Sequence, residues 1–169
     1  GYRRYFNRYS KGRKHIVLGT EPEGEMEGII YEYPMEIAEK ILAQIDPREG
    51  FRPDRDTEIN SYLRAPVYID TKKHPNGVRA IVYVTNPDGP GYKGHLAIET
   101  QARELSSGKG YKYLRDVTDA LQKAKCSDNY VTSLLEQVEA RRAVKTASKR
   151  LSERHLLKSV DRVADRFCE

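Results

Sequence analysis

Apolar and polar residues follow a strand-like pattern in the first part of the chain. In residues 2–9 and again in residues 15–19, short aromatic and β-branched stretches flank a turn at Ser10–Gly12, which is typical of two strands in a hairpin. Residues 26–33 alternate only weakly, but their isoleucines and tyrosines favour a third strand. Pro34 then marks the start of a helix.

One face of that helix is formed by four apolar residues, Ile37, Ile41, Leu42 and Ile45. The helix is expected to end at Asp46, because a residue that precedes proline is disfavoured in the helical conformation. Glu49 would then lie on the loop that follows a buried helix, next to the permissive Gly50. A side chain in such a loop can project into a cleft, so Glu49 is a candidate catalytic group.

The middle of the chain reads as a second hairpin followed by helices. Residues 59–70 and 78–85 have strand-like alternation on either side of an Asn-Gly turn. Residues 86–94 are too rich in glycine and proline for a regular element and suit a mobile lid, and helices are expected to resume near Leu96 and Tyr111.

Two amphipathic helices, separated near Arg142, are predicted for the C-terminal part. The apolar stripe of the first consists of Val131, Leu134, Leu135 and Val138. The stripe of the second consists of Val144, Ala147, Leu151, Leu157, Val160, Ala164 and Phe167. A length of 169 residues suits one domain with an appendage, so we place a domain at residues 1–125 and a basic helical extension at residues 126–169.

Composition excludes several classes of protein. The chain has no apolar run near the roughly 20 residues needed to span a bilayer. Its two cysteines, Cys126 and Cys168, lie far apart, which argues against a disulfide framework and favours a reducing compartment. The histidines show no ligand spacing and the glycines form no phosphate-binding loop, so we expect neither a metal nor a cofactor. The histidines are His15, His74, His95 and His155.

Positive charge gathers at the two ends of the chain. Residues 141–169 hold nine Lys or Arg against four Asp or Glu, and the first fourteen residues hold six basic residues and no acid. These charges suit either solvated faces or contact with RNA phosphates or an acidic protein. Candidate polyanion contacts are Arg3, Arg4, Arg8, Arg141, Arg142, Lys145, Lys149 and Arg150.

Several short motifs occur in the order found in the gamma-glutamylcyclotransferase superfamily, of which the ChaC-like proteins are a branch. Gly1–Phe6 resembles its G-Y-x-R-x-F strand, and Glu27–Glu32 resembles its V-x-G-V-x-Y strand. Ile45–Gly50 resembles its L-D-x-R-E-x turn, which is the key match. Residues 80–92 resemble its A-L-V-Y-x-x-x-P-x-x-P-x-Y segment, and Tyr113 with Leu114 resembles its E-Y-L helix.

The resemblance implies an α+β fold with a mixed, barrel-like sheet, flanking helices and, in this chain, a C-terminal helical extension. It implies cleavage of a gamma-glutamyl amide such as glutathione to 5-oxoproline and an amine, without a cofactor. Glu49 would be the acid/base, and Tyr92 and Tyr113 would contact the substrate. Without the family context, Glu49 reads as a solvated surface charge and the tyrosines as packing.

In the family, a Y-G-S-L loop that holds the substrate carboxylates precedes the strand that resembles Gly1–Phe6. We expect the given chain to lack this loop, so that either another segment supplies it or the domain no longer catalyses. The alternative function is a catalytically degenerate domain that serves as a structural subunit of a large, RNA-containing, organellar ribosome-like assembly. The expected compartment is the cytoplasm or, for the alternative, the matrix of a mitochondrion or another organelle.

Overall fold

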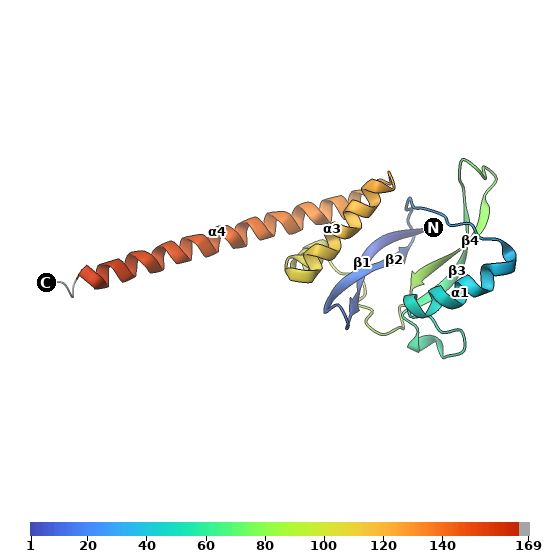
Figure 1. Ribbon diagram of the computed structural model, residues 1–169, viewed down its shortest axis with the longest axis horizontal. Helices are drawn as coiled ribbons and strands as arrows, with labels where there is room; N and C mark the ends of the chain where they lie inside the picture. Colours follow the sequence, from blue (N-terminus) through green and yellow to red (C-terminus); the bar gives the residue numbers. More distant parts are fainter. Residues whose placement is uncertain (166–169) are drawn as a thin grey trace.

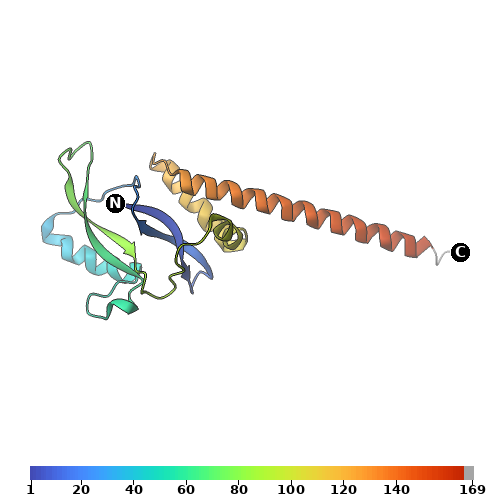
Figure 2. The ribbon, with the colours of Figure 1, turned by 180° about the vertical axis from the view of Figure 1, so that it is seen from behind.

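Two β-hairpins and four α-helices build an α+β fold, as the sequence predicts. The computed structural model describes residues 1–165, with side chains as far as Ser152. The elements follow in the order β1 (Tyr2–Ser10), β2 (His15–Pro22), α1 (Met35–Glu49), the 3-10 helix η1 (Thr57–Ile59), β3 (Tyr62–Ile69), β4 (Val78–Thr85), α2 (Ile98–Leu105), α3 (Gly108–Lys123) and α4 (Asn129–Asp165). The hairpins lie side by side, α1 flanks β3 and β4, and α2 to α4 lie beyond β1 and β2 (Figures 1 and 2).

The described strands form two antiparallel sheets of two strands each, β1–β2 and β3–β4. Both hairpins were expected, and β1 contains a register shift between Tyr5 and Arg8. The sheets are joined where β2 approaches β4, because the Thr20 amide donates to Thr85 Oγ1 at 2.8 Å and the Thr85 amide donates to Thr20 Oγ1 at 2.9 Å. Threonine hydroxyls thus satisfy two strand amides and hold the hairpins together.

The hydrophobic core lies between the first hairpin and the helices α2, α3 and α4. Buried apolar side chains from all of these elements meet there: Phe6, Ile16, Ala102, Leu105, Leu114, Val131, Leu134 and Val138. The first turns of α4 therefore complete the same core as β1 and β2. The division at residue 125 stays a prediction.

Residues 26–33 do not form the expected strand, so that prediction was wrong. They have no regular structure and pair with no strand among the described residues. Several of their apolar side chains are exposed, including Ile29 at 60% and Tyr31 at 72%. Strand propensity reflects the fit to a paired, half-buried surface, and this segment has no such surface beside it.

The helix α1 begins after Pro34 as expected, but it does not end at Asp46. It continues through Pro47 to Glu49, so Glu49 is the last residue of the helix and not part of a loop. Asp46 is buried, where it accepts a hydrogen bond from the Tyr83 hydroxyl at 2.6 Å and lies 3.6 Å from Arg64 Nε. These tertiary contacts hold the residue before proline in the helix against its local preference.

The expected break near Arg142 is also absent, because α4 is a single helix of 37 residues. Its first stripe is confirmed: Val131, Leu134 and Val138 are buried. Beyond them the helix leaves the domain (Figure 1), and Val144 and Leu151 are 66% and 57% exposed. The stripe shifts because the helix loses its neighbours, not because it ends. The side chains expected at Leu157, Val160, Ala164 and Phe167 lie outside the described residues.

No helix in the described part of the chain is both long and apolar enough to cross a membrane.

The segment 86–94 has no helix or ladder of strands, as expected, but it is held along β1. The Tyr9 amide donates to the Gly91 carbonyl at 2.7 Å, and the Lys93 amide donates to the Asn7 carbonyl at 2.8 Å. Gly91 has a φ of +84°, and a Cβ atom there would lie 2.4 Å from the Tyr9 carbonyl oxygen. Only glycine allows this close approach.

Candidate active site

Glu49 is placed by the end of α1 and by the start of β3. Gly50 ends the helix in the left-handed conformation with a φ of 69°, and its amide donates to the carbonyls of Asp46 and Pro47. The Gly50 carbonyl then accepts a hydrogen bond from the Ser61 amide at 2.9 Å. This cap turns the chain so that the partly buried Glu49 lies next to the first residues of β3.

Replacement of Gly50 by alanine tests this cap. The left-handed conformation costs a residue with a Cβ atom about 1–2 kcal/mol, and the new Cβ would lie 3.0 Å from the Ser61 side chain. We expect Gly50→Ala to lower the free energy of unfolding by about this amount, measured by urea denaturation. Gly12→Ala is the control, because nothing lies within 4 Å of a Cβ at that position. Equal stability of the two variants would contradict the prediction.

Two tyrosine hydroxyls meet at the main chain of Leu18 in β2. The Tyr62 hydroxyl donates to the Leu18 carbonyl at 2.8 Å, and the Tyr113 hydroxyl accepts from the Leu18 amide at 3.3 Å. Tyr62 comes from β3 and Tyr113 from α3, so three elements converge here. In the described part of the chain, the proton of the Tyr113 hydroxyl has no acceptor, so it is free to be donated to a ligand.

The charge of Glu49 acts on this pair of phenols. Burial raises the pKa of both hydroxyls above the usual value for tyrosine, and the negative charge of Glu49 raises it further. Glu49 acts in the same direction on the pKa of Tyr83, where burial and the hydrogen bond to Asp46 are the larger causes. Glu49 is therefore surrounded by phenols from β3, β4 and α3.

Arg8 supplies a positive charge beside the same phenols. Its guanidinium lies over the Tyr62 ring, 4.8 Å from the ring centroid, and its Nη2 donates to Ser61 Oγ. Its buried Nε has no hydrogen-bond partner among the described residues. The Arg8 charge opposes the rise in the pKa of Tyr62. A buried donor without a partner is rare and fits a place that a ligand would complete.

Of the residues predicted for the site, the structure brings Glu49 and Tyr113 together but not Tyr92. Tyr92 pairs its backbone with Arg8. Its side chain has no hydrogen bond or ring contact to Glu49, Tyr62 or Tyr113 in the described part of the chain. Its role in substrate binding stays a prediction.

Sequence reasoning missed Tyr62 as a site residue. The signal was its parity in the strand: Tyr62 and Arg64 alternate with the apolar residues of β3, and Arg64 lies opposite Tyr83 in the ladder. Directly opposed residues of an antiparallel pair share a face. This parity therefore marks the polar face that meets the end of α1.

The candidate polyanion contacts divide into two groups. Arg3 and Arg4 are engaged in ion pairs, with Glu21 at 3.0 Å and with Asp128 at 2.9 Å. Arg142 lies over the Tyr111 ring, and Lys145 reaches the Ser106 hydroxyl. The exposed group on the projecting part of α4 consists of Arg141, Lys149 and Arg150. Contact of any of these residues with RNA or an acidic protein stays a prediction.

Comparison with known proteins places this arrangement in a family. No match is found among curated proteins. Among solved structures, the chain is similar to the crystal structure of a gamma-glutamyl cyclotransferase from yeast that is specific to glutathione. The TM-score is 0.57 at 18% identity, over 84% of this chain and 87% of the yeast chain, so the likeness concerns the fold. The family model of ChaC-like proteins matches residues 5–141, which include β1, α1 with Glu49, and α3 with Tyr113. The chain therefore belongs to the ChaC-like protein family.

Proposed function

We propose that this chain is a gamma-glutamylcyclotransferase that converts a glutathione-like gamma-glutamyl amide to 5-oxoproline and an amine. The observation that carries the proposal is the placement of the Glu49 carboxylate beside the hydroxyls of Tyr62 and Tyr113. A base next to two phenols is what proton transfer and carbonyl polarisation require. The proposal includes a barrel-like sheet, for which the Thr20–Thr85 link between the hairpins provides support.

The reaction needs no nucleophile from the protein. The α-amine of the substrate attacks its own γ-carbonyl carbon, a five-membered ring closes, and the bond to the leaving nitrogen breaks. Ring closure is fast once the substrate is folded correctly, because both reacting groups belong to one molecule. Glu49 takes the proton that the amine loses and returns it to the leaving nitrogen.

The phenols orient the substrate and stabilise charge. The free proton of the Tyr113 hydroxyl is the candidate donor to the carbonyl oxygen, where negative charge develops during attack. Arg8, whose Nε lacks a partner among the described residues, is the candidate partner for a substrate carboxylate.

Glutathione is the substrate to test first, because the yeast protein of similar fold is specific to it. The protein is incubated with glutathione above about 1 mM, the upper end of usual KM values. The products are then separated by chromatography. We expect 5-oxoproline and cysteinylglycine in equal amounts. If neither accumulates above the rate without protein, the proposed function is wrong.

Replacement of Tyr113 by phenylalanine tests the proposed donor. The variant keeps the ring and its packing but loses one hydrogen bond to a developing negative charge. We expect kcat/KM for 5-oxoproline release to fall by about tenfold or more. Tyr111→Phe is the control on the same helix, because that hydroxyl donates to the exposed Glu139. Equal kcat/KM in the two variants would exclude Tyr113 as a donor.

A further inference from the structure

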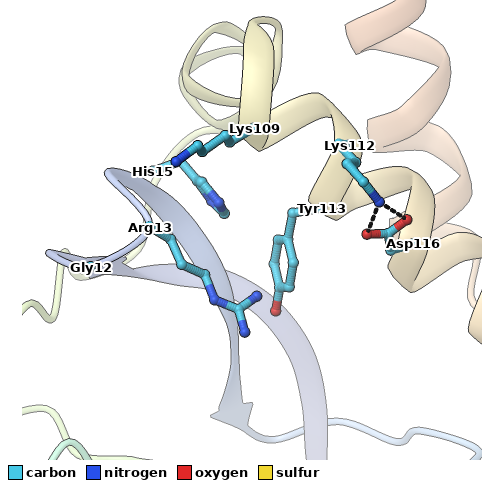
Figure 3. A pocket seen from close by; sticks show the side chains of 7 residues that line it. All are labelled: Gly12, Arg13, His15, Lys109, Lys112, Tyr113 and Asp116. Atoms are coloured by element: carbon cyan, nitrogen blue, oxygen red, sulfur yellow. Dashed lines mark hydrogen bonds and ion pairs between the residues drawn. The ribbon is translucent and has the colours of Figure 1, made fainter.

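A basic pocket lies on the other side of Tyr113, between the turn of the first hairpin and α3. It is a hollow of about 240 Å³. Figure 3 shows the side chains that line it: Gly12, Arg13, His15, Lys109, Lys112, Tyr113 and Asp116. Because Tyr113 belongs both to this pocket and to the candidate active site, the two sites are neighbours.

Most polar groups of the pocket are donors or positive charges. Arg13 lies over the Tyr113 ring, 5.0 Å from its centroid, and neither Arg13 nor Lys109 has an ion-pair partner among the described residues. The pocket's one acid, Asp116, is already paired with Lys112 at 2.9 Å. The pocket therefore keeps an excess of positive charge, which favours an anionic ligand.

His15 adds a buried polar group to this pocket. It is only 6% exposed, and its Nδ1 donates to the Ile16 carbonyl at 2.7 Å. Its other ring nitrogen, Nε2, has no hydrogen-bond partner in the described part of the chain. A nitrogen buried without a partner is an exception that a bound ligand would explain.

We propose that this pocket binds the carboxylate at the far end of the gamma-glutamyl substrate, on the amine fragment that the reaction releases. The inference rests on the proposed function. Arg13 and Lys109 hold the carboxylate through charge-assisted hydrogen bonds, and the ring of Tyr113 forms the wall between this group and the reacting carbonyl.

The spacing of the two sites fits a tripeptide. Leu18, where the Tyr62 and Tyr113 hydroxyls meet, is three residues from His15 along β2, which is about 10 Å at the rise of a strand. In a substrate such as glutathione, two residues separate the γ-carbonyl from the far carboxylate, and they span about 7 Å when extended. A charged side chain such as Arg13 or Lys109 covers the remaining distance.

The pocket is tested by the selectivity between glutathione and its glycine ethyl ester, which lacks only the far negative charge. We expect the protein to prefer glutathione by about tenfold in kcat/KM, the effect of one charge-assisted contact. In the double variant Arg13→Gln, Lys109→Gln this preference should disappear. Lys123→Gln is the control, because Lys123 is exposed in the last turn of the same helix, outside the pocket.

A binding measurement separates this inference from the proposed function. Calorimetry with the Glu49→Gln protein gives the affinity for glutathione and for the ester without turnover, and we expect the same tenfold preference and the same loss in the double variant. If no 5-oxoproline forms from either compound, the proposed function fails and the calorimetry alone decides the pocket. Equal affinity for acid and ester, no binding of glutathione, or an unchanged preference in the double variant would overturn the inference.

Discussion

Glu49→Gln is expected to lower the rate of 5-oxoproline release by about 10²–10⁴-fold, the usual contribution of a general acid/base. Glutamine has the size of glutamate and keeps an oxygen that accepts hydrogen bonds, but it cannot take the proton of the substrate ammonium. The loss should therefore appear in kcat, with little change in the fold of α1. The measurement is the initial rate with glutathione in saturating amounts, together with circular dichroism of both proteins.

The matched control is Glu36→Gln, an exposed glutamate in the first turn of the same helix. It removes one negative charge from α1 without touching the tyrosines around Glu49, so it should leave the rate near that of the original protein. A Glu49→Gln protein with a rate within about tenfold of the Glu36→Gln protein would show that another group moves the proton.

Phe6→Ala should have the largest effect on stability, with a loss of about 3–5 kcal/mol in the free energy of unfolding. Phe6 is fully buried in β1 and contacts Tyr113 edge-on, at 6.1 Å between ring centroids, as well as Tyr130. Truncation leaves a cavity where the hairpin meets α3 and α4. Urea denaturation measures the change directly.

Tyr68→Ala is the control for this loss, because Tyr68 is also an aromatic residue of a strand but is 81% exposed. Its removal should cost far less, since little apolar surface leaves a buried environment. A Phe6→Ala protein as stable as the Tyr68→Ala protein would mean that the core between β1 and the helices is not where the fold is held together.

Local patterns predicted the elements well wherever turn residues and periodicity agreed. Both hairpins, the start of α1 after Pro34, and the helices α2 and α3 follow from such agreement. The failures arose where distant contacts decide. Asp46 stays helical before a proline because Tyr83 and Arg64 hold its carboxylate.

The candidate site was only half visible in the sequence, for a related reason. Glu49 and Tyr113 belong to short motifs, so the family resemblance marked them. Tyr62 and Arg8 carry no motif and become site residues only when β3 and β1 are brought beside the end of α1. Pairing between distant strands is a property of the fold that no window of residues contains.

The two phenols near Glu49 are anchored to the peptide unit of residue 18 and not to its side chain. A side-chain change at this position therefore keeps both anchoring atoms, so the residue is free to vary as long as β2 keeps its path. A slip of β2 by one residue would instead displace both hydroxyls together. The accuracy of the candidate site is thus set by the alignment of one strand, and it can be inherited by chains that share little sequence at that strand.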